Sequence, residues 1–360
     1  MKHKFRTALL LGALAGLGLN APLQAAPAKK PTHLAAKKGE SAAANKVRAA
    51  NKSVTPSRSG LAKNSQAKKP LKSAKATSGK SGKAAHAVAY VSKQPIRRVS
   101  MADVDPGKLA LYSSSALVID QNTGRTLLEK HSDAVTPIAS ISKLMTAMVV
   151  LDAKLDLNEV IAIGDEDVDG LKGTRSRLPV GTTMTRETAM LLALMSSENR
   201  AAHALGRHYP GGMQAFVAAM NRKAYALGMS NSRFEEPTGL SSNNVSTAHD
   251  LARMVAAAAR YPEIRSYSTT GEAKVELNGR ISDFHNTNAL VRSENWEIGL
   301  SKTGYISEAG RCLVMQARVA DKPVVIVLLD SVGKMTRVGD ANRIKRWMES
   351  ASLDFGKRSS

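Results

Sequence analysis

Hydrophobic and polar positions follow two patterns along most of this chain, one typical of strands and one typical of helices. Short apolar runs flank an Asn-Thr-Gly turn at 122–124, a pattern that predicts a β-hairpin over 115–131. The pattern then changes to a helical period, in which apolar residues recur every third or fourth position. The positions concerned are Ile141, Leu144, Met145, Met148 and Val149. They predict an amphipathic helix over 140–153 that begins at Ser140.

Later segments predict further helices. Residues 186–196 are apolar almost all round, which is typical of a buried helix. Residues 212–227 predict another helix, which Gly228 ends. Thr247 and Asp250 resemble a capping box at the start of the helical run that follows them.

The last part of the chain is rich in strands. β-Rich runs occupy 297–303, 311–319 and 323–330, and a tight Ala-Asp-Lys-Pro turn joins the last two as a hairpin. A closing helix is expected over 338–351. The order of strands, helices, strands and helix predicts an α/β fold of the α+β sandwich kind. We expect an antiparallel sheet whose edges come from distant parts of the chain, packed by helices, with a helical subdomain.

The N-terminal segment predicts export. Residues 1–25 combine a cationic start, an apolar run and small residues that suit cleavage. The apolar run is too short for a comfortable membrane span, so we interpret 1–25 as a cleaved signal peptide. An uncleaved short membrane anchor is the alternative.

Most of the positive charge lies in the segment that follows. Residues 26–98 hold 18 lysine and arginine residues against one acidic residue, a net charge of +17 out of +22 for the whole chain. Few large apolar residues occur there, so a disordered linker is expected. Export argues against nucleic acid as its partner and favours an anionic envelope surface or a solvated tether. The single cysteine, Cys312, excludes an intramolecular disulfide.

Ser140 and Lys143 form a Ser-x-x-Lys pair in apolar surroundings. Residues spaced i, i+3 share a helix face. A serine at a helix N-terminus also lies where backbone N–H groups can stabilise an oxyanion. To act as a base, Lys143 must be neutral, and burial or a second cation would lower its pKa. The structural alternatives are an N-cap serine and a lysine whose ammonium group reaches solvent.

Two further motifs supply candidate partners for this pair. The Lys-Thr-Gly at 302–304 offers a cation, a hydroxyl and a glycine that lets a substrate approach the backbone. Ser197 and Asn199 fall between two predicted helices, where a hydroxyl and an amide can project from a turn. Ser-x-Asn also occurs at 242–244 and 293–295, but the position after a buried helix favours the first.

The three motifs, in this order, resemble the active-site set of penicillin-binding proteins and serine β-lactamases. The stretches PIASISKLMTAMVVLD, LMSSENRAAHALGRHYPGG and GLSKTGYISEAGRC are similar to D-alanyl-D-alanine endopeptidases of the penicillin-binding protein 7/8 type. These endopeptidases are part of the wider D-alanyl-D-alanine carboxypeptidase family. The resemblance covers about 100–350 and implies a β-lactamase/transpeptidase-like fold, with a catalytic domain over 99–360.

The resemblance also implies residue roles. Ser140 would be the acylated nucleophile, Lys143 its general base, and Ser197 a relay that carries a proton toward the leaving amine. The oxyanion hole would be formed by the backbone N–H groups of Ser140 and Tyr305. The implied substrate-binding residues are Asn199, Lys302, Thr303, Gly304 and Tyr305. No metal and no cofactor is implied.

The function implied is that of a periplasmic serine DD-endopeptidase acting in cell wall remodelling. It would hydrolyse D-alanyl–meso-diaminopimelyl cross-links of peptidoglycan through an acyl-enzyme. β-Lactam antibiotics would be covalent inhibitors, and no nucleic acid partner or transmembrane anchor is expected. A β-lactamase is disfavoured, because no glutamate begins a Glu-x-x-Leu-Asn pattern and Glu198 replaces the aspartate common in those enzymes.

Two other functions remain open from the residues. A D-alanyl-D-alanine carboxypeptidase that trims pentapeptide stems would use the same motifs. A non-catalytic wall-binding module with a basic tail would not need these motifs. The intact Ser140–Lys143 pair argues against such a module.

Overall fold

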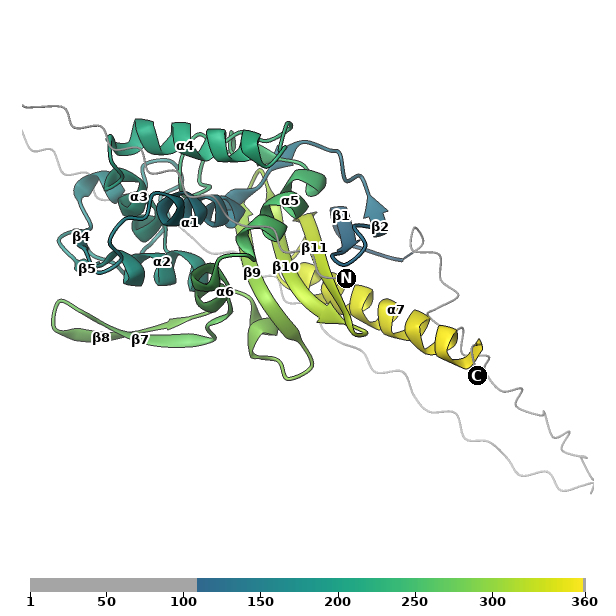
Figure 1. Cartoon of the computed structure of the whole chain (residues 1–360). Coiled ribbons are helices and arrows are strands. Elements are labelled where there is room, and N and C mark those ends of the chain that lie inside the picture. The colour runs from purple at the N-terminus through teal and green to yellow at the C-terminus, as the bar shows by residue number, and fades with distance from the viewer. Residues whose placement is uncertain (1–108, 359–360) are drawn as a thin grey trace, which may run out of the picture. The chain divides into compact units, whose positions relative to one another are not determined.

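The computed structural model describes residues 109–358, so the predicted signal peptide (1–25) and linker (26–98) lie outside the described residues. A five-stranded antiparallel sheet with the order β2-β1-β11-β10-β9 forms the centre of the described part (Figure 1). In that order the strands are Thr126–Lys130, Ser113–Asp120, Lys322–Ser331, Gly310–Val319 and Glu297–Ile306.

The sheet joins strands from both ends of the described chain, as predicted. β1 pairs with β11, so that Leu117 lies opposite Val327, and the edges are β2 and β9. The hairpin of β10 and β11 turns at Ala320 and Asp321, whose φ angles are 49° and 62°. Two positive φ angles match the twist that a two-residue hairpin turn needs. The predicted hairpins at 115–131 and in the C-terminal strands are thereby confirmed.

Helices cover both faces of the sheet. Successive residues of a strand point to opposite faces, so each face of β11 joins a different core cluster. Val327 packs in the cluster that includes α5 (Ala248–Ala258), and Ile326 packs in the cluster that includes α7 (Thr336–Arg358). The closing helix predicted at 338–351 is therefore present and longer than expected.

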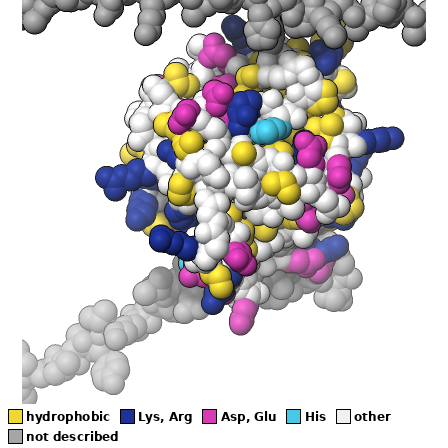
Figure 2. Space-filling model, turned by 90° about the vertical axis from the view of Figure 1, so that its left-hand side faces the viewer, with side chains coloured by type: hydrophobic (Ala, Val, Ile, Leu, Met, Phe, Trp, Pro, Cys, Tyr) yellow, Lys and Arg dark blue, Asp and Glu magenta, His cyan; other side chains and the backbone are white. Residues whose placement is uncertain are grey.

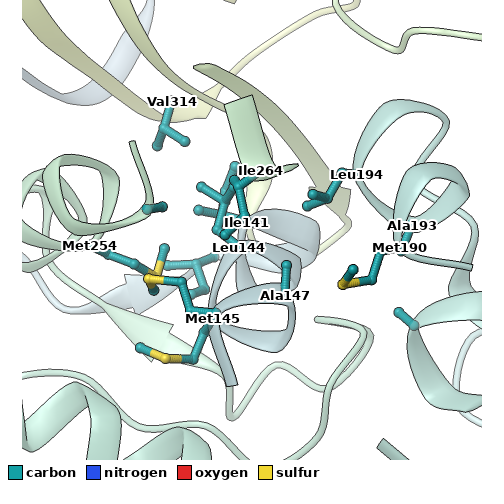
Figure 3. Packing of buried hydrophobic residues seen from close by; sticks show 14 of the residues in the cluster. Ile141, Leu144, Met145, Ala147, Met190, Ala193, Leu194, Met254, Ile264 and Val314 are labelled. Atoms are coloured by element: carbon teal, nitrogen blue, oxygen red, sulfur yellow. The ribbon is translucent and has the colours of Figure 1, made fainter. Parts of the chain in front are cut away.

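A helical part adjoins the sheet and is built around α1 (Ser142–Asp152). Helices α2 (Arg186–Met195), α3 (Asn199–Arg207) and α4 (Gly212–Ala226) contact α1, as do α5 and α6 (Pro262–Thr269). Figure 3 shows the apolar side chains of α1 between those of the helices around it. The helices predicted at 186–196 and 212–227 are confirmed as α2 and α4.

The first helix is not amphipathic, contrary to the prediction. Every residue from Ser142 to Val150 is buried, because neighbouring helices surround α1 and leave it no face toward solvent. The helix also begins later than predicted. Ser140 lies in a short 3₁₀ turn, η3 (Ala139–Ile141), which leads directly into α1.

Three small two-stranded sheets complete the described part, and the sequence analysis did not predict them. β3 pairs with β6, β4 with β5, and β7 with β8. Their bounds are Thr136–Pro137 and Val245–Ser246, Val160–Ala162 and Thr183–Thr185, and Glu272–Leu277 and Arg280–His285. β7 and β8 form a long hairpin below the helical part (Figure 1).

The start of α5 bears out half of the predicted capping box. Thr247 Oγ1 accepts a hydrogen bond of 3.2 Å from the backbone N–H of Asp250. The Asp250 carboxylate instead accepts hydrogen bonds from Ser232 and Arg253, so it holds neighbouring segments together.

The surface of the described part carries charges of both signs. Figure 2 shows acidic and basic side chains on the same face of the helical part. Across residues 109–358, no helix combines the length and apolar character that crossing a membrane requires.

Candidate active site

Ser140 is held in the 3₁₀ turn before α1, and its side chain does not cap that helix. The residue preceding α1 is Ile141, and no side chain makes a cap hydrogen bond there. Ser142 instead closes the turn, because its hydroxyl donates a hydrogen bond of 2.9 Å to Ala139 O. The N-cap interpretation of Ser140 is therefore wrong, and its hydroxyl is available for another partner.

That partner is Lys143. Its Nζ lies 2.8 Å from Ser140 Oγ, 2.7 Å from Asn199 Oδ1 and 2.6 Å from the backbone oxygen of Thr238. The side chain is fully buried, so the alternative of an ammonium group that reaches solvent is also wrong. Burial lowers the pKa of Lys143 from 10.5 to about 7, although the carboxylates of Glu236 and Glu198 act in the opposite direction.

The three partners of Lys143 favour a proton acceptor facing Ser140. Two of them, Asn199 Oδ1 and Thr238 O, are carbonyl oxygens that only accept hydrogen bonds. A neutral amine has two N–H donors and one lone pair. When the two donors go to the carbonyl oxygens, the lone pair is left for the hydroxyl of Ser140. The arrangement can therefore remove a proton from Ser140 without any further rearrangement.

Lys302 lies on β9 and brings the second and third motifs together. Its Nζ donates to Ser197 Oγ at 2.9 Å and to Thr303 O at 3.1 Å. Burial holds the pKa of Lys302 well below its usual range, and the nearby cations Lys143 and Arg337 lower it further. The sequence argument named burial and a second cation as the two causes that would lower the pKa of Lys143. Burial is the main cause there, and the repulsion between the two lysines acts on Lys302.

Ser197 occupies a strained position between two helices. Its φ angle is 62°, in the left-handed region that favours glycine, and it falls between the end of α2 and the start of α3. This conformation turns the Ser197 hydroxyl toward Lys302, while Asn199 in the first turn of α3 reaches Lys143. Strain of this kind is typical of functional sites.

The open edge of β9 presents backbone N–H groups beside Ser140. The Ser301 N–H faces away from β10 and donates to Ser268 Oγ at 3.3 Å. Alternate residues of a strand face the same edge, so the N–H of Tyr305 also lies on the open edge. The backbones approach closely here, since a Cβ on Gly304 would lie 3.1 Å from Ser140 N. The N–H groups of Ser140 and Tyr305 can therefore form one oxyanion site.

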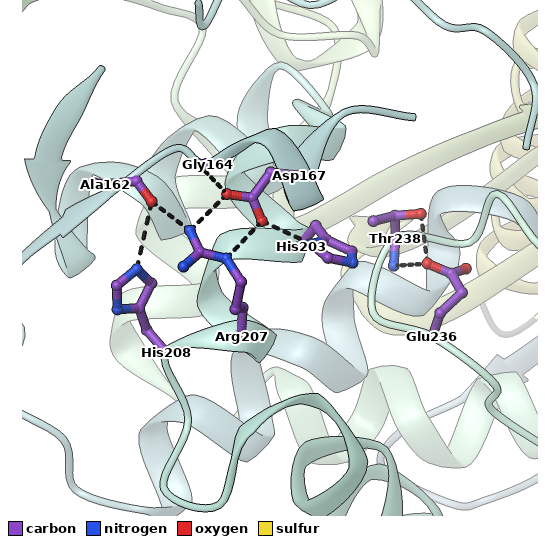
Figure 4. Close-up of polar contacts among 8 residues, drawn as sticks. All are labelled: Ala162, Gly164, Asp167, His203, Arg207, His208, Glu236 and Thr238. Carbon is purple, nitrogen blue, oxygen red and sulfur yellow. Dashed lines mark hydrogen bonds and ion pairs between the residues drawn. The ribbon is translucent and has the colours of Figure 1, made fainter. Parts of the chain in front are cut away.

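A loop before β6 completes the surroundings of Lys143, and sequence reasoning missed it. The Glu236 carboxylate accepts hydrogen bonds of 2.6 Å from the N–H groups of Thr238 and Gly239, and Figure 4 shows its contacts with Thr238. These bonds fix the backbone so that Thr238 O faces Lys143. Gly239 has a φ angle of 80°, and a Cβ there would lie 1.9 Å from Ala139 O. The Pro-Thr-Gly turn was the only sequence signal.

Two further residues near β9 were also missed. Arg337, at the start of α7, donates from Nη1 to Gly304 O at 3.0 Å. Thr287, in the loop after β8, shares a hydrogen bond of 2.6 Å with the hydroxyl of Thr303. Neither lies within a motif. Arg337 adds a cation beside Lys302, so this end of the site suits a carboxylate.

Glu198 anchors the loop that carries Ser176 and Arg177. Its carboxylate accepts hydrogen bonds from Ser176 Oγ at 2.7 Å and from Arg177 Nε at 2.9 Å. Asn199 Nδ2 donates to Thr174 Oγ1 at 2.9 Å. The middle residue of the Ser-x-Asn motif therefore joins the loop between β4 and β5 to the start of α3.

An ion-pair cluster fixes the other end of this loop. The buried Asp167 carboxylate accepts hydrogen bonds from His203 at 2.7 Å and from Arg207 at 2.8 Å (Figure 4). Burial would raise the pKa of Asp167, but these partners outweigh it and lower the pKa to about 2. His203 thus has a structural role at this end of the loop.

The described residues contain one grouping of side chains with metal-binding geometry, namely Glu129, Asp133 and His249. These side chains are exposed or half-buried and belong to β2, the loop after it and α5. None of them contacts the residues around Ser140.

A serine hydroxyl beside a buried lysine with a lowered pKa is the arrangement of a serine acyl-transfer enzyme. Comparison with protein families agrees: the model for D-alanyl-D-alanine carboxypeptidases matches residues 101–333. The chain belongs to this family of serine peptidases. The resemblance stated from the sequence is thereby confirmed.

Individual relatives give the same picture. A D-alanyl-D-alanine endopeptidase of Pseudomonas aeruginosa is 51% identical over 250 residues, which cover 69% of this chain and 81% of the relative. One from Escherichia coli is 49% identical over 245 residues, covering 68% and 79%. A D-alanyl-D-alanine carboxypeptidase of Streptomyces is 30% identical over 257 residues, covering 67% and 88%.

Solved structures confirm the predicted fold class. The Streptomyces K15 DD-transpeptidase has a TM-score of 0.62 and 27% identity, with 66% of this chain and 97% of that chain covered. Penicillin-binding protein D2 of Listeria monocytogenes in its ampicillin-bound form has a TM-score of 0.57 and 29% identity, with 68% and 98% covered.

Proposed function

We propose that this chain is a serine DD-endopeptidase that hydrolyses D-alanyl–meso-diaminopimelyl cross-links in peptidoglycan. The observation that carries the mechanism is the position of Lys143 Nζ, 2.8 Å from Ser140 Oγ and bound to two carbonyl oxygens. The choice of endopeptidase over carboxypeptidase rests on the two relatives of that name at 51% and 49% identity.

Acylation begins when Ser140 Oγ attacks the carbonyl carbon of the D-alanyl residue and Lys143 Nζ takes the hydroxyl proton. The oxyanion that develops is stabilised by the N–H groups of Ser140 and Tyr305. The carbon–nitrogen bond then breaks. Lys143 gives up the proton that it took from Ser140, and the leaving diaminopimelyl amine receives this proton through Ser197, whose hydroxyl is held by Lys302. The product is a D-alanyl ester on Ser140.

Deacylation uses the same groups. A water molecule attacks the ester carbonyl while Lys143 accepts its proton, and the oxyanion again faces the two N–H groups. The ester bond breaks, and the proton returns to Ser140 Oγ. A stem peptide ending in D-alanine leaves, and the cross-link is opened.

The leaving group carries a carboxylate on the carbon next to the scissile nitrogen. We assign this carboxylate to Lys302, Thr303 and Arg337, the cationic end of the site. The low pKa of free Lys302 is due first to burial and then to neighbouring cations. An arriving carboxylate supplies the missing counter-charge, raises this pKa and so strengthens its own binding.

β-Lactams are proposed to acylate the same hydroxyl. Their strained amide carbonyl would occupy the position of the D-alanyl carbonyl, and their carboxylate the position of the leaving-group carboxylate. The structurally similar Listeria penicillin-binding protein D2 is known in an ampicillin-bound form. From the character of residues 1–25 we also propose that the enzyme acts in the periplasm, and that residues 26–98 form a linker to the catalytic domain.

The test is a digest of purified, cross-linked muropeptides with the intact chain and with Ser140→Ala. We expect loss of cross-linked dimers, and gain of tetrapeptide monomers, only with the unaltered chain. Mass spectrometry of the products distinguishes the alternatives. Conversion of pentapeptides to tetrapeptides with dimers untouched would indicate a carboxypeptidase. Binding to the wall without any cleavage would revive the wall-binding module.

A further inference from the structure

We propose that Arg175 binds a free carboxylate on the acyl side of the substrate and so determines which cross-linked stems are cut. This inference rests on the proposed function and adds a substrate feature to it. The carboxylate concerned belongs to the stem peptide upstream of the D-alanyl residue. It is distinct from the leaving-group carboxylate assigned to Lys302 and Arg337.

A polar cavity of about 380 Å³ adjoins the candidate active site. It is lined by Arg175, Ser176, Arg177, Ser196, Ser197, Glu198 and Asn199. Two of these residues, Ser197 and Asn199, also contact the lysines beside Ser140. The cavity therefore shares part of its lining with the surroundings of Ser140, and we infer that a peptide acylated on Ser140 extends toward it.

The cavity lining contains two arginine residues. Arg177 is paired with other residues of the chain, and Arg175 is not paired with any residue that the structure describes. Arg177 is held by Glu198 at 2.9 Å, donates to Asp283 O at 3.3 Å, and stacks 4.3 Å over the ring of Phe284. Arg175 is exposed, and its guanidinium makes no hydrogen bond, ion pair or ring contact with any residue that the structure describes. With Glu198 neutralising Arg177, the lining carries one uncompensated positive charge, that of Arg175.

Hydrogen bonds hold the residues on both sides of Arg175. On one side, Thr174 receives a hydrogen bond from Asn199 and its N–H donates to Asp169 Oδ2 at 2.8 Å. On the other side, Ser176 and Arg177 are bound to Glu198. Only the side chain of Arg175 must be ordered when a ligand binds, which keeps the entropic cost small. The guanidinium group of Arg175 is therefore largely preorganised for binding a ligand.

The chemistry of Arg175 selects a carboxylate. A guanidinium group binds a carboxylate through two parallel hydrogen bonds, which adds geometric selectivity to the charge attraction. Peptidoglycan stems of the proposed substrate class carry two carboxylates upstream of the D-alanyl residue. One is on the side chain of the diaminopimelyl residue and the other on the γ-linked glutamyl residue. Both present the same group, so the experiment must separate them.

The test compares the intact chain with Arg175→Gln, Arg175→Lys and the control Arg222→Gln. Arg222 is an exposed arginine of α4, so its replacement removes the same charge away from the cavity. Each protein is assayed for kcat/KM on cross-linked muropeptides with both carboxylates free, with the diaminopimelyl carboxylate amidated, or with the glutamyl carboxylate amidated. Thermal unfolding checks that each variant is folded.

With both carboxylates free, Arg175→Gln is expected to lower kcat/KM about tenfold, mainly through KM, as for loss of a charged hydrogen bond. Arg175→Lys is expected to recover part of this loss, and Arg222→Gln to show none. Amidating the recognised carboxylate should lower kcat/KM of the unaltered chain by a similar factor and leave kcat/KM of Arg175→Gln unchanged. Whichever amidation behaves this way identifies the source.

Two results would overturn the assignment to Arg175. One is an Arg175→Gln variant that cuts the free-carboxylate substrate as fast as the unaltered chain. The other is an equal loss on amidated and free substrates, because the effect would then have nothing to do with a carboxylate. Absence of any Ser140-dependent cleavage by the unaltered chain is a separate result, and it would reject the proposed function itself.

Discussion

The reactivity of Ser140 depends on the protonation state of one neighbouring amine. Protonated Lys143 has no lone pair and cannot accept the Ser140 proton. Since burial lowers its pKa to about 7, the neutral fraction falls about tenfold for each pH unit below that value. We therefore predict that the rate of Ser140 acylation by a β-lactam rises with pH up to about 7 and then levels off.

Stopped-flow acylation measured from pH 5 to pH 9 tests this prediction. The control is Lys143→Arg, whose guanidinium stays charged throughout. It should acylate about 10²–10⁴-fold more slowly and lose the acidic limb of the profile. A flat profile for the unaltered chain would mean that Lys143 is not the base.

The backbone near Ser140 is as constrained as the side chains. Gly239→Ala would place a Cβ 1.9 Å from Ala139 O at a φ angle of 80°, so the 3₁₀ turn that holds Ser140 must move. We predict that the rate of β-lactam acylation falls about 10²-fold, the effect of a displacement of about 1 Å.

Gly279→Ala is the matched control. Its φ angle is 74°, but no atom lies within 4 Å of the added Cβ. It should cost only the ~1–2 kcal/mol of an unfavourable backbone conformation. Equal acylation by the two variants would refute the steric argument.

At the residue scale, the sequence identified the side chains but not their backbone partners. Motif spacing pointed to Ser140, Lys143 and Lys302, and the structure brings them together. It could not point to Thr238 O, because any residue can supply a carbonyl oxygen and only the fold decides which one reaches Lys143. Arg337 was missed for a similar reason, since it approaches Gly304 from a separate helix outside any motif.

At the scale of elements, turn chemistry was a better guide than amphipathic period. The turns at 122–124 and 320–321 predicted two of the three hairpins of the main sheet, and the third, formed by β9 and β10, was not predicted. The period of apolar residues in α1 led to the wrong prediction of an amphipathic helix, because a helix with neighbours on all sides has no face toward solvent. The hairpin β7–β8 was missed although the sequence carries signals for it. Glu272–Leu277 alternates polar and apolar residues, and Asn278-Gly279, with φ angles of 52° and 74°, is a pair typical of a two-residue hairpin turn.

The cap of α5 gives a prediction at this scale. Thr247 Oγ1 accepts the N–H of Asp250, a group that the helix itself leaves without a partner. Thr247→Ala should therefore lower the free energy of unfolding by about 1 kcal/mol, as measured by urea denaturation. Thr269→Ala serves as the control, since that hydroxyl only bonds carbonyls at the exposed end of α6. It should change stability by less than ~0.5 kcal/mol. Equal losses would show that the cap contributes nothing specific.

At the scale of the whole molecule, charge and catalysis belong to different segments. Residues 26–98 carry a net charge of +17 and residues 99–360 only +2, while every residue around Ser140 lies in the second segment. The attraction of an anionic wall polymer should therefore act on the first segment and weaken as salt screens it. We predict that a chain lacking 26–98 cuts soluble cross-linked muropeptides at the unaltered rate but binds purified sacculi less tightly at low salt.

Co-sedimentation with sacculi at 50 mM and 300 mM NaCl measures this difference. The intact chain should lose much of its binding between these salt concentrations, because a lysine-rich segment binds by displacing counterions. The shortened chain should bind weakly at both concentrations, and only through the cleft beside Ser140. Its rate on soluble muropeptides reports that the catalytic part is intact. If deletion leaves the low-salt binding unchanged, the basic segment is a spacer, and wall affinity must come from the small net charge and the substrate cleft of 99–360.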